Sequence, residues 1–364
     1  MSARKPFAGL RGSRGFTLVE LMVGLAIGMF MMIGLVSLIV STTSARTELD
    51  KSSRQIENGR YAMQLLSQDI QLAGFTGETA SSSFTAQAPV ACPATVSDLG
   101  YSPSTTPGAS TVPMPLYVAT TTPSCISNVV AGTAVLVVSR VDTATVALAS
   151  ANSSEVYLQV SACANDSLPF AAAAATPAAS AAAAFTLMQK DCTAANLAQL
   201  RKIVQHVYYV SSCNVCGTGA GTDTTPTLKM AEFVNGAMTI TPLVEGIENL
   251  QFDYGIDMDG NGSPDCYVSD PTSPPAAQIA VGVCPQPSTP YDWTVAASNW
   301  ANVMAVRIHV LARSTETSAG WTDSRTYDMG LAASSAVTAG DHYKRHVYST
   351  VARLNNASGQ RETP

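Results

Sequence analysis

The most pronounced hydrophobic pattern is a run of predominantly apolar residues near the start of the chain. It covers residues 16–40 and contains one charged side chain, Glu20. A stretch of 25 residues is long enough to cross a lipid bilayer as a helix. The sequence therefore predicts a membrane-spanning helix at residues 16–40.

An amphipathic pattern continues this run over residues 41–73. Apolar or small residues recur every seven positions in two neighbouring rows: Leu49, Ile56, Met63 and Ile70, and Ser52, Gly59, Leu66 and Ala73. This spacing is typical of a helix that packs by one stripe on its own domain. We expect the charged residues between the rows, Asp69 among them, to form the solvated side, and the helix to end before Gly74.

Strand patterns dominate the rest of the chain. Alternating or β-branched apolar residues predict strands at residues 135–138, 156–160, 203–210, 250–254, 304–310 and 346–354. Asn235-Gly236, between two short apolar runs, predicts a β-hairpin, because both residues tolerate the positive φ of a type I′ turn. One long helix followed by many strands indicates an α+β fold, in which the helix packs on a mostly antiparallel sheet.

Two segments have a loop-like composition. Residues 80–124 are rich in Ser, Thr, Pro and Ala, which predicts long surface loops. Residues 171–184 are almost entirely Ala but contain Pro177, which would interrupt a helix, so we interpret this segment as a tolerated insertion.

The charge distribution excludes one class of partner. The formal charge of −6 combines +4 in residues 1–15, which hold four basic residues and no acid, with −10 in the remainder. Phosphate backbones are bound by clustered Lys and Arg, so an acidic body argues against a nucleic-acid partner. A basic segment before an apolar helix is expected to stay on the cytoplasmic side of a membrane.

The junction between the basic segment and the apolar run carries a processing signal. Gly15 precedes the run, so cleavage after it would remove residues 1–15 as a leader and leave the apolar helix on the mature chain. Gly15-Phe16-Thr17-Leu18-Val19-Glu20-Leu21 resembles the class III signal of type IV prepilins. The resemblance implies that prepilin peptidase cuts between Gly15 and Phe16 and that Phe16 is N-methylated. It also implies that Glu20, the fifth mature residue, pairs with the new amino terminus during filament assembly.

A simpler interpretation of Glu20 remains open. A carboxylate inside a bilayer costs roughly 2.5–3.5 kcal/mol at mid-membrane and less near an end, which marks it as a candidate functional group. In a plain signal anchor the same residue would lie at the membrane interface without a partner.

Blocks in the second half of the chain extend the resemblance to one group of minor pilins. The segments 243–255, 257–262, 303–308, 311–314 and 343–350 resemble the PilW group and occur in the same order. This implies a minor pilin, without catalytic activity, that acts with other minor pilins and the major pilin at the pilus tip, where a tip adhesin is a further candidate partner. It also implies an inner-membrane precursor whose globular domain, residues 74–364, lies in the periplasm and reaches the cell surface in the pilus.

Two other functions remain open from the sequence. A type II secretion pseudopilin would share the same N-terminal signal. A signal-anchored periplasmic enzyme or binding protein would lack the Gly15–Phe16 cleavage.

Cysteine usage indicates an oxidising compartment. All eight cysteines follow the apolar run, as expected for disulfides in an exported domain: Cys92, Cys125, Cys163, Cys192, Cys213, Cys216, Cys266 and Cys284. Eight cysteines allow 105 pairings; we adopt the pairing of sequence neighbours. Cys213-x-x-Cys216 fits a structural disulfide, a redox pair or half of a zinc site. The glycine-rich sequence that follows it favours the structural disulfide.

One acidic loop has the spacing of a calcium ligand set. Asp257, Asp259 and Asn261 occupy positions 1, 3 and 5 of a calcium loop, Gly262 follows for the sharp turn, and Asp265 is at position 9. Position 12, normally a bidentate Glu, is Val268. A Ca²⁺ site and a metal-free acidic turn therefore both remain open. No other cofactor is expected.

No catalytic motif accompanies the four histidines. His206, His309, His342 and His346 lie outside any nucleophile elbow or metalloprotease motif, and we interpret each as a surface or hydrogen-bonded histidine.

Overall fold

The structure is a computed structural model that describes residues 15–78, 84–175, 183–234, 236–332 and 337–362. The chain divides into two units, Met1–Lys51 and Ser52–Pro364. The described part of the first unit is almost entirely helical, whereas the second combines a helical segment with β-sheets. The sequence prediction of α+β with a mostly antiparallel sheet is confirmed.

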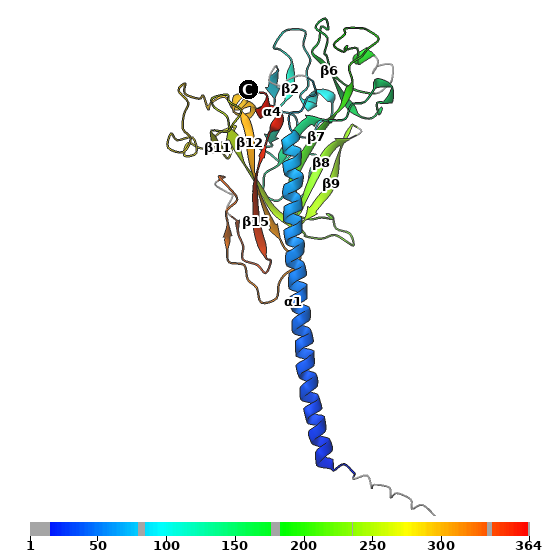
Figure 1. Ribbon diagram of the computed structural model, residues 1–364, viewed down its shortest axis with the longest axis vertical. Helices are drawn as coiled ribbons and strands as arrows, with labels where there is room; N and C mark the ends of the chain where they lie inside the picture. Colours follow the sequence, from blue (N-terminus) through cyan, green and yellow to red (C-terminus); the bar gives the residue numbers. More distant parts are fainter. Residues whose placement is uncertain (1–14, 79–83, 176–182, 235, 333–336, 363–364) are drawn as a thin grey trace, which may run out of the picture. The chain divides into compact units, whose positions relative to one another are not determined.

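Helix α1, Leu18–Leu72, follows the predicted apolar and amphipathic segments (Figure 1). It ends as predicted, because Gly74 adopts a φ of +73°, which a side chain would disfavour. The N–H of Phe75 donates to the carbonyl of Leu72, and the N–H of Gly74 donates to Ser139 in a strand.

Two antiparallel sheets form the body of the second unit. The seven-stranded sheet has the order β3-β4-β7-β5-β6, with β8 pairing with β7 and β9 with β8. Its strands are β3 (Leu116–Val118), β4 (Leu136–Val141), β5 (Val156–Val160), β6 (Phe170–Ala174), β7 (Leu200–Ser211), β8 (Thr227–Val234) and β9 (Ala237–Glu245). The four-stranded sheet has the order β11-β10-β12-β15, formed by β10 (Ile247–Ile256), β11 (Cys266–Val268), β12 (Val303–Arg313) and β15 (Arg345–Arg353).

Shorter elements complete the fold. They are the strands β1 (Thr85–Gln87), β2 (Thr111–Pro113), β13 (Thr326–Tyr327) and β14 (Val337–Thr338), the 3-10 helices η2 (Val96–Leu99) and η3 (Leu148–Ser150), and the helices α3 (Ala296–Ala301) and α4 (Asn355–Gly359). β1 and β2 pair in parallel, and both lie within the predicted loop segment 80–124.

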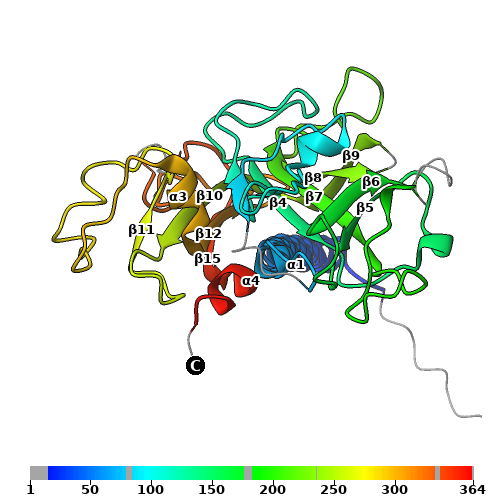
Figure 2. The ribbon, with the colours of Figure 1, turned by 90° about the horizontal axis from the view of Figure 1, so that it is seen from above.

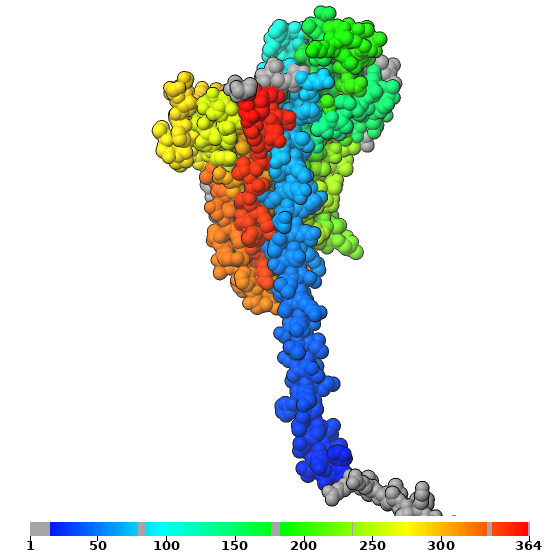
Figure 3. Space-filling view, viewed as in Figure 1, coloured from blue at the N-terminus to red at the C-terminus, as the bar shows by residue number. Residues whose placement is uncertain are grey.

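The part of α1 from Ser52 onward packs between the two sheets (Figure 2). Leu66 and Ile70 are fully buried in one core with Leu136 and Val210 of the larger sheet and Ile308 of the smaller. The opposite side of this helical segment is exposed and is visible as an uncovered band in Figure 3. One side of this helical segment therefore joins the two sheets in a common core.

The predicted strands are all found, and Val234 pairs with Ala237 across the predicted hairpin, although Asn235 lies outside the described residues. One segment was interpreted wrongly. Residues 171–174 of the Ala-rich stretch belong to β6 and pair with β5, because small side chains fit a strand that is covered by the loops around Phe185. Residues 176–182 lie outside the described residues.

Candidate functional site

The predicted cleavage junction lies just outside the helix. Gly15, Phe16 and Thr17 have no regular secondary structure and are exposed, and Phe16 exposes 85% of its surface. A peptidase must bind its substrate backbone in an accessible conformation, and this junction meets that requirement. Residues 1–14 of the predicted leader lie outside the described part of the chain.

Glu20 caps the start of the helix. Its carboxylate accepts hydrogen bonds from the backbone N–H and the hydroxyl of Thr17, each at 3.0 Å. The Glu20 N–H donates in return to the Thr17 hydroxyl at 3.3 Å. This reciprocal capping box satisfies N–H groups that have no partner within the helix. It also holds the carboxylate at the N–H of Thr17. Thr17 directly follows Phe16, whose nitrogen cleavage would turn into a charged amine.

The apolar half of α1 has an exposed hydrophobic surface all around. Eighteen large apolar side chains between Phe16 and Val40 are each more than half exposed. Among the described residues, α1 is the one helix that is long and apolar enough to cross a membrane. Gly24 and Gly28 leave open space where a side chain would lie, so another helix could approach closely at this point.

The buried stripe of α1 agrees with the predicted rows from Gly59 to Ala73 but not at their start. Leu49 and Ile56 of the first predicted row are exposed by 69% and 47%. The buried residues of α1 include three that the rows did not contain, Gln55, Ala62 and Asp69, so the stripe is wider than predicted. The full set is Gln55, Gly59, Ala62, Met63, Leu66, Asp69 and Ile70. The helix therefore presents two polar side chains, Gln55 and Asp69, to the interior.

Asp69 is buried, which corrects its predicted place on the solvated side. Its carboxylate lies 2.8 Å from the Arg140 guanidinium, 2.7 Å from His206 Nδ1 and 2.9 Å from the Tyr208 hydroxyl. Burial opposes ionisation of Asp69, but the hydrogen bonds and positive charges of His206 and Arg140 outweigh it and lower the pKa to about 2. The cluster fastens α1 to β4 and β7.

The predicted calcium ligands converge in part. Oxygens of Asp257, Asp259 and Asp265 lie within 4.8 Å of one another. The Asn261 oxygen instead accepts the N–H of Ser263 at 2.7 Å. The Asp257 carboxylate is buried and already compensated, since Arg361 Nη1 lies 3.1 Å from it. This cation neutralises part of the charge that would attract Ca²⁺, and the calcium site stays a prediction.

The eight cysteines form four disulfides between sequence neighbours, as we predicted. The pairs are Cys92–Cys125, Cys163–Cys192, Cys213–Cys216 and Cys266–Cys284. No free cysteine remains in the structure. Each bond closes a local loop, so together they restrain the long connections of the second unit.

Three of the histidines have hydrogen-bond partners, as predicted. His206 contacts Asp69, and His342 Nδ1 lies 2.6 Å from the carbonyl of Trp321. His346, on β15, is exposed and stacks edge-on against Tyr348.

The third hydrogen-bonded histidine lies in a chain of polar groups across the smaller sheet. His309 lies between Ser349, 2.9 Å from its Nδ1, and Asp253, 3.0 Å from its Nε2. These are the residue types of a hydrolase triad. The Asp253 carboxylate also accepts the N–H of Leu331 at 2.8 Å and faces Arg307 at 3.5 Å, so it serves as a link between β10, β12 and the loop before β14.

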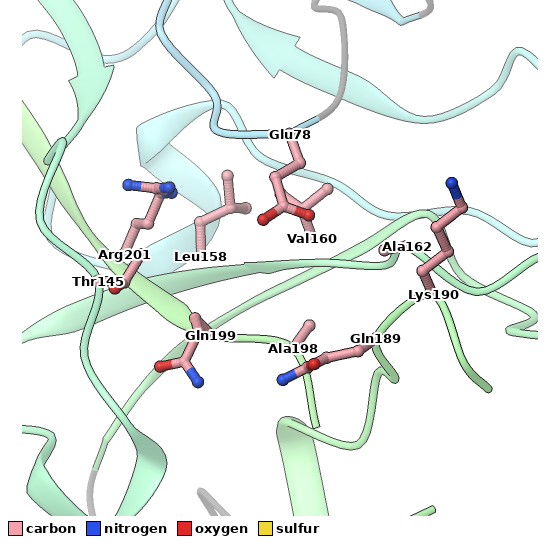
Figure 4. Close-up of a pocket in the computed structure, with 10 residues that line it drawn as sticks. All are labelled: Glu78, Thr145, Leu158, Val160, Ala162, Gln189, Lys190, Ala198, Gln199 and Arg201. Carbon is pink, nitrogen blue, oxygen red and sulfur yellow. The ribbon is translucent and has the colours of Figure 1, made fainter. Parts of the chain in front are cut away.

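A hollow of about 260 Å³ opens beside β5 and β7 (Figure 4). Glu78 lies across it from Ala198 and Gln199, which precede β7. Its lining combines charged groups from Glu78, Lys190 and Arg201 with aliphatic side chains, and it includes neither a cysteine nor a histidine. The lining residues do not form a nucleophile–base pair of the kind used in covalent catalysis.

Comparison with known families locates two matches. The family described as Type IV Pilus-assembly protein W matches residues 207–356, and the Prokaryotic N-terminal methylation motif matches residues 10–36. No curated protein and no solved structure matches the chain significantly. The matched segments contain the blocks that carry the sequence resemblance, and they confirm that the chain resembles type IV pilin-like proteins and the PilW group. The methylation motif and the apolar helix together indicate a membrane-anchored precursor.

Proposed function

We propose that this type IV pilin-like chain is a minor pilin, a non-catalytic subunit that helps to start pilus assembly at the tip. The observation that carries the proposal is the exposed apolar surface of residues 16–40, which begins directly at an accessible Gly15–Phe16 peptide. Burying one large apolar side chain is worth roughly 1.5–3 kcal/mol. Eighteen such side chains therefore require an apolar environment, first lipid and then the helices of neighbouring subunits.

Glu20 supplies the specificity in this proposal. Its carboxylate caps α1 at the N–H of Thr17, and Thr17 directly follows Phe16, whose nitrogen cleavage would convert into an amine. In the apolar core of a filament an unpaired carboxylate is costly, so it would select a partner amine on its own or a neighbouring subunit. That selection would set the stagger between subunits. The partners in this scheme are the other minor pilins, the major pilin and prepilin peptidase.

A position at the tip is supported by the bulk of the second unit. Long connections closed by disulfides emerge around both sheets, among them 92–125 and 163–192. A shaft repeats one compact subunit, whereas a cap has no such restriction. The match to Type IV Pilus-assembly protein W favours the pilus over the alternative of a type II secretion pseudopilin. Deletion of the gene is expected to abolish surface pili and to leave secretion intact; the reverse pattern would favour the pseudopilin.

Mass spectrometry of the mature N-terminus tests the processing step. The expected mature chain begins with N-methylated Phe16. A chain that retains residues 1–15, or one cut elsewhere, would contradict the proposal and favour a signal-anchored enzyme or binding protein.

A Glu20→Gln variant tests the assembly step. It keeps the size of the side chain and part of the cap but removes the charge. The variant should be cleaved normally and yet be depleted from sheared pili at least about tenfold, because the amine loses its counter-charge. Asp50→Asn, an exposed charge on the same helix outside the apolar run, is the matched control and should enter pili normally. Normal incorporation of Glu20→Gln would refute the electrostatic pairing.

A further inference from the structure

A buried lysine lies against one of the four disulfides. Lys229, in β8, is only 7% exposed, and its ammonium lies 3.4 Å from the Sγ of Cys216. Among the described residues it forms no ion pair with a carboxylate within 4.0 Å, and a disulfide sulfur is a weak acceptor. The charge of Asp223 acts on Lys229, but the Asp223 carboxylate accepts hydrogen bonds from three backbone N–H groups of its own loop.

A buried ammonium of this kind is poorly compensated while the disulfide is closed. Burial lowers the pKa of Lys229, and the charge of Asp223 only partly opposes this effect. Opening of the disulfide would place a thiolate at Cys216 and give the ammonium its missing counter-charge. A neighbouring cation lowers the pKa of a cysteine thiol and stabilises the reduced form.

The Cys213–Cys216 bond also differs from the other three in what it restrains. Its cysteines are three positions apart, whereas those of the other bonds are 18, 29 and 33 apart. In the chain-entropy description a short loop restrains the unfolded chain least. No lysine or arginine nitrogen contacts a sulfur of the other three bonds in the described part of the chain.

We propose that Cys213–Cys216 is a thiol–disulfide exchange site, at which Cys216 forms the mixed disulfide with an external thiol and Lys229 stabilises its thiolate. The external partner belongs to the class of small thiols and dithiol oxidoreductases. Cys216 is half-buried and therefore more accessible than Cys213, which is 7% exposed.

The exchange balances in both directions. For oxidation, the Cys216 thiolate attacks a disulfide of the partner, forms a mixed disulfide and expels one partner thiolate. Cys213 then loses its proton and attacks Cys216 Sγ, which closes the bond and expels the second partner thiolate. Two electrons pass to the partner. For reduction, an external thiolate attacks Cys216 and expels Cys213, and a second thiolate then frees Cys216 beside Lys229.

A glutathione titration of the full chain in detergent micelles tests the site. Free thiols are alkylated at each ratio of reduced to oxidised glutathione, and each disulfide is followed by peptide mass spectrometry. Cys213–Cys216 should open at a ratio at least about tenfold less reducing than the other three bonds, with glutathione attached to Cys216. Opening of all four bonds together, or attachment at Cys213, would overturn the proposal.

Two variants separate the role of Lys229 from general stability. Lys229→Met keeps the length of the side chain and should shift the equilibrium about tenfold toward the closed bond. Lys202→Met is the matched control: it removes a cation of β7 that is paired with Glu155 and Glu232, and it should leave the thiol–disulfide equilibrium unchanged. Equal behaviour of the two variants would overturn the assignment.

A direct thiol titration covers the case in which Lys229→Met folds poorly. In a Cys213→Ser chain, alkylation rates against pH report the thiol pKa of Cys216, on which Lys229, Asp223 and Glu245 are the neighbouring charges. The pKa should lie below the ordinary value of about 8.5. A value at or above it would show that the ammonium does not stabilise the thiolate.

Discussion

Replacement of Asp69 by asparagine should destabilise the second unit by a predictable amount. The substitution keeps the shape of the side chain and removes one negative charge from a site that is only 7% exposed. Arg140, at 2.8 Å, and His206, at 2.7 Å, would lose their counter-charge. Because these residues lie on β4 and β7, the change weakens the attachment of α1 to the larger sheet.

The magnitude follows from the lowered pKa. The pKa falls from 3.8 to about 2, and at about 1.36 kcal/mol per pKa unit the folded state favours the ionised form by roughly 2–3 kcal/mol. Removing one partner of a buried ion pair costs about 3–5 kcal/mol. We expect the loss of stability to match the smaller of these two estimates, the one from the pKa, because asparagine still accepts and donates hydrogen bonds. With an unfolding entropy of about 2.1 cal/mol/K per residue over residues 52–364, this corresponds to a Tm lower by about 3–5 °C.

Thermal unfolding followed by circular dichroism, in detergent at several pH values, measures this effect. The folded-state pKa of Asp69 is depressed, so its contribution is complete above pH 4 and is lost as pH falls toward 2. The difference in Tm between wild type and Asp69→Asn should therefore be largest at neutral pH and vanish near pH 2. Glu57→Gln, an exposed position on the same helix, should change Tm by less than about 1 °C. A neutral-pH effect of Asp69→Asn as small as that of this control would refute the reasoning.

Two further predictions concern packing and metal binding. Gly59→Ala should lower the free energy of unfolding by about 1–3 kcal/mol, because the new Cβ would overlap the ring of Tyr348. A Gly59→Ala/Tyr348→Leu double variant should recover part of this loss in thermal unfolding. Gly24→Ala, with open space at the Cβ, is the control and should leave Tm unchanged. Calorimetric titration with Ca²⁺ should release or absorb heat with the wild type but not with an Asp257→Ala/Asp259→Ala variant, and the absence of heat from the wild type would end the calcium hypothesis.

Local sequence signals were sufficient to predict the long helix and the main strands of the fold, whereas the short strands and helices were not predicted. The apolar run, the glycine after residue 73 and the alternating segments predicted α1 and the main strands, because each depends on periodicity and on backbone freedom within a few residues. The pairing of cysteines with their sequence neighbours was also found, since each disulfide closes a local loop.

The errors occurred where a residue's environment depends on distant segments. The seven-residue spacing placed Leu49 and Ile56 on the packed stripe and Asp69 in solvent. An ideal helix turns by about 20° per heptad relative to such a row, so a row alone does not fix which side is buried. Asp69 can be buried because His206 and Arg140 are its charge partners. These two residues lie 137 and 71 positions away in the sequence. No signal next to Asp69 could have revealed this.

The features of the candidate site also fall into those that the sequence determines and those that depend on the tertiary structure. The sequence by itself determined the apolar helix, the position of Glu20 near its start and the expected junction at Gly15, because these features are contiguous in the chain. Only the tertiary structure decided that Arg361 lies against Asp257 and that Lys229 lies against Cys216. Such contacts join separate strands and loops, and they form only when burial of the apolar core brings those segments together.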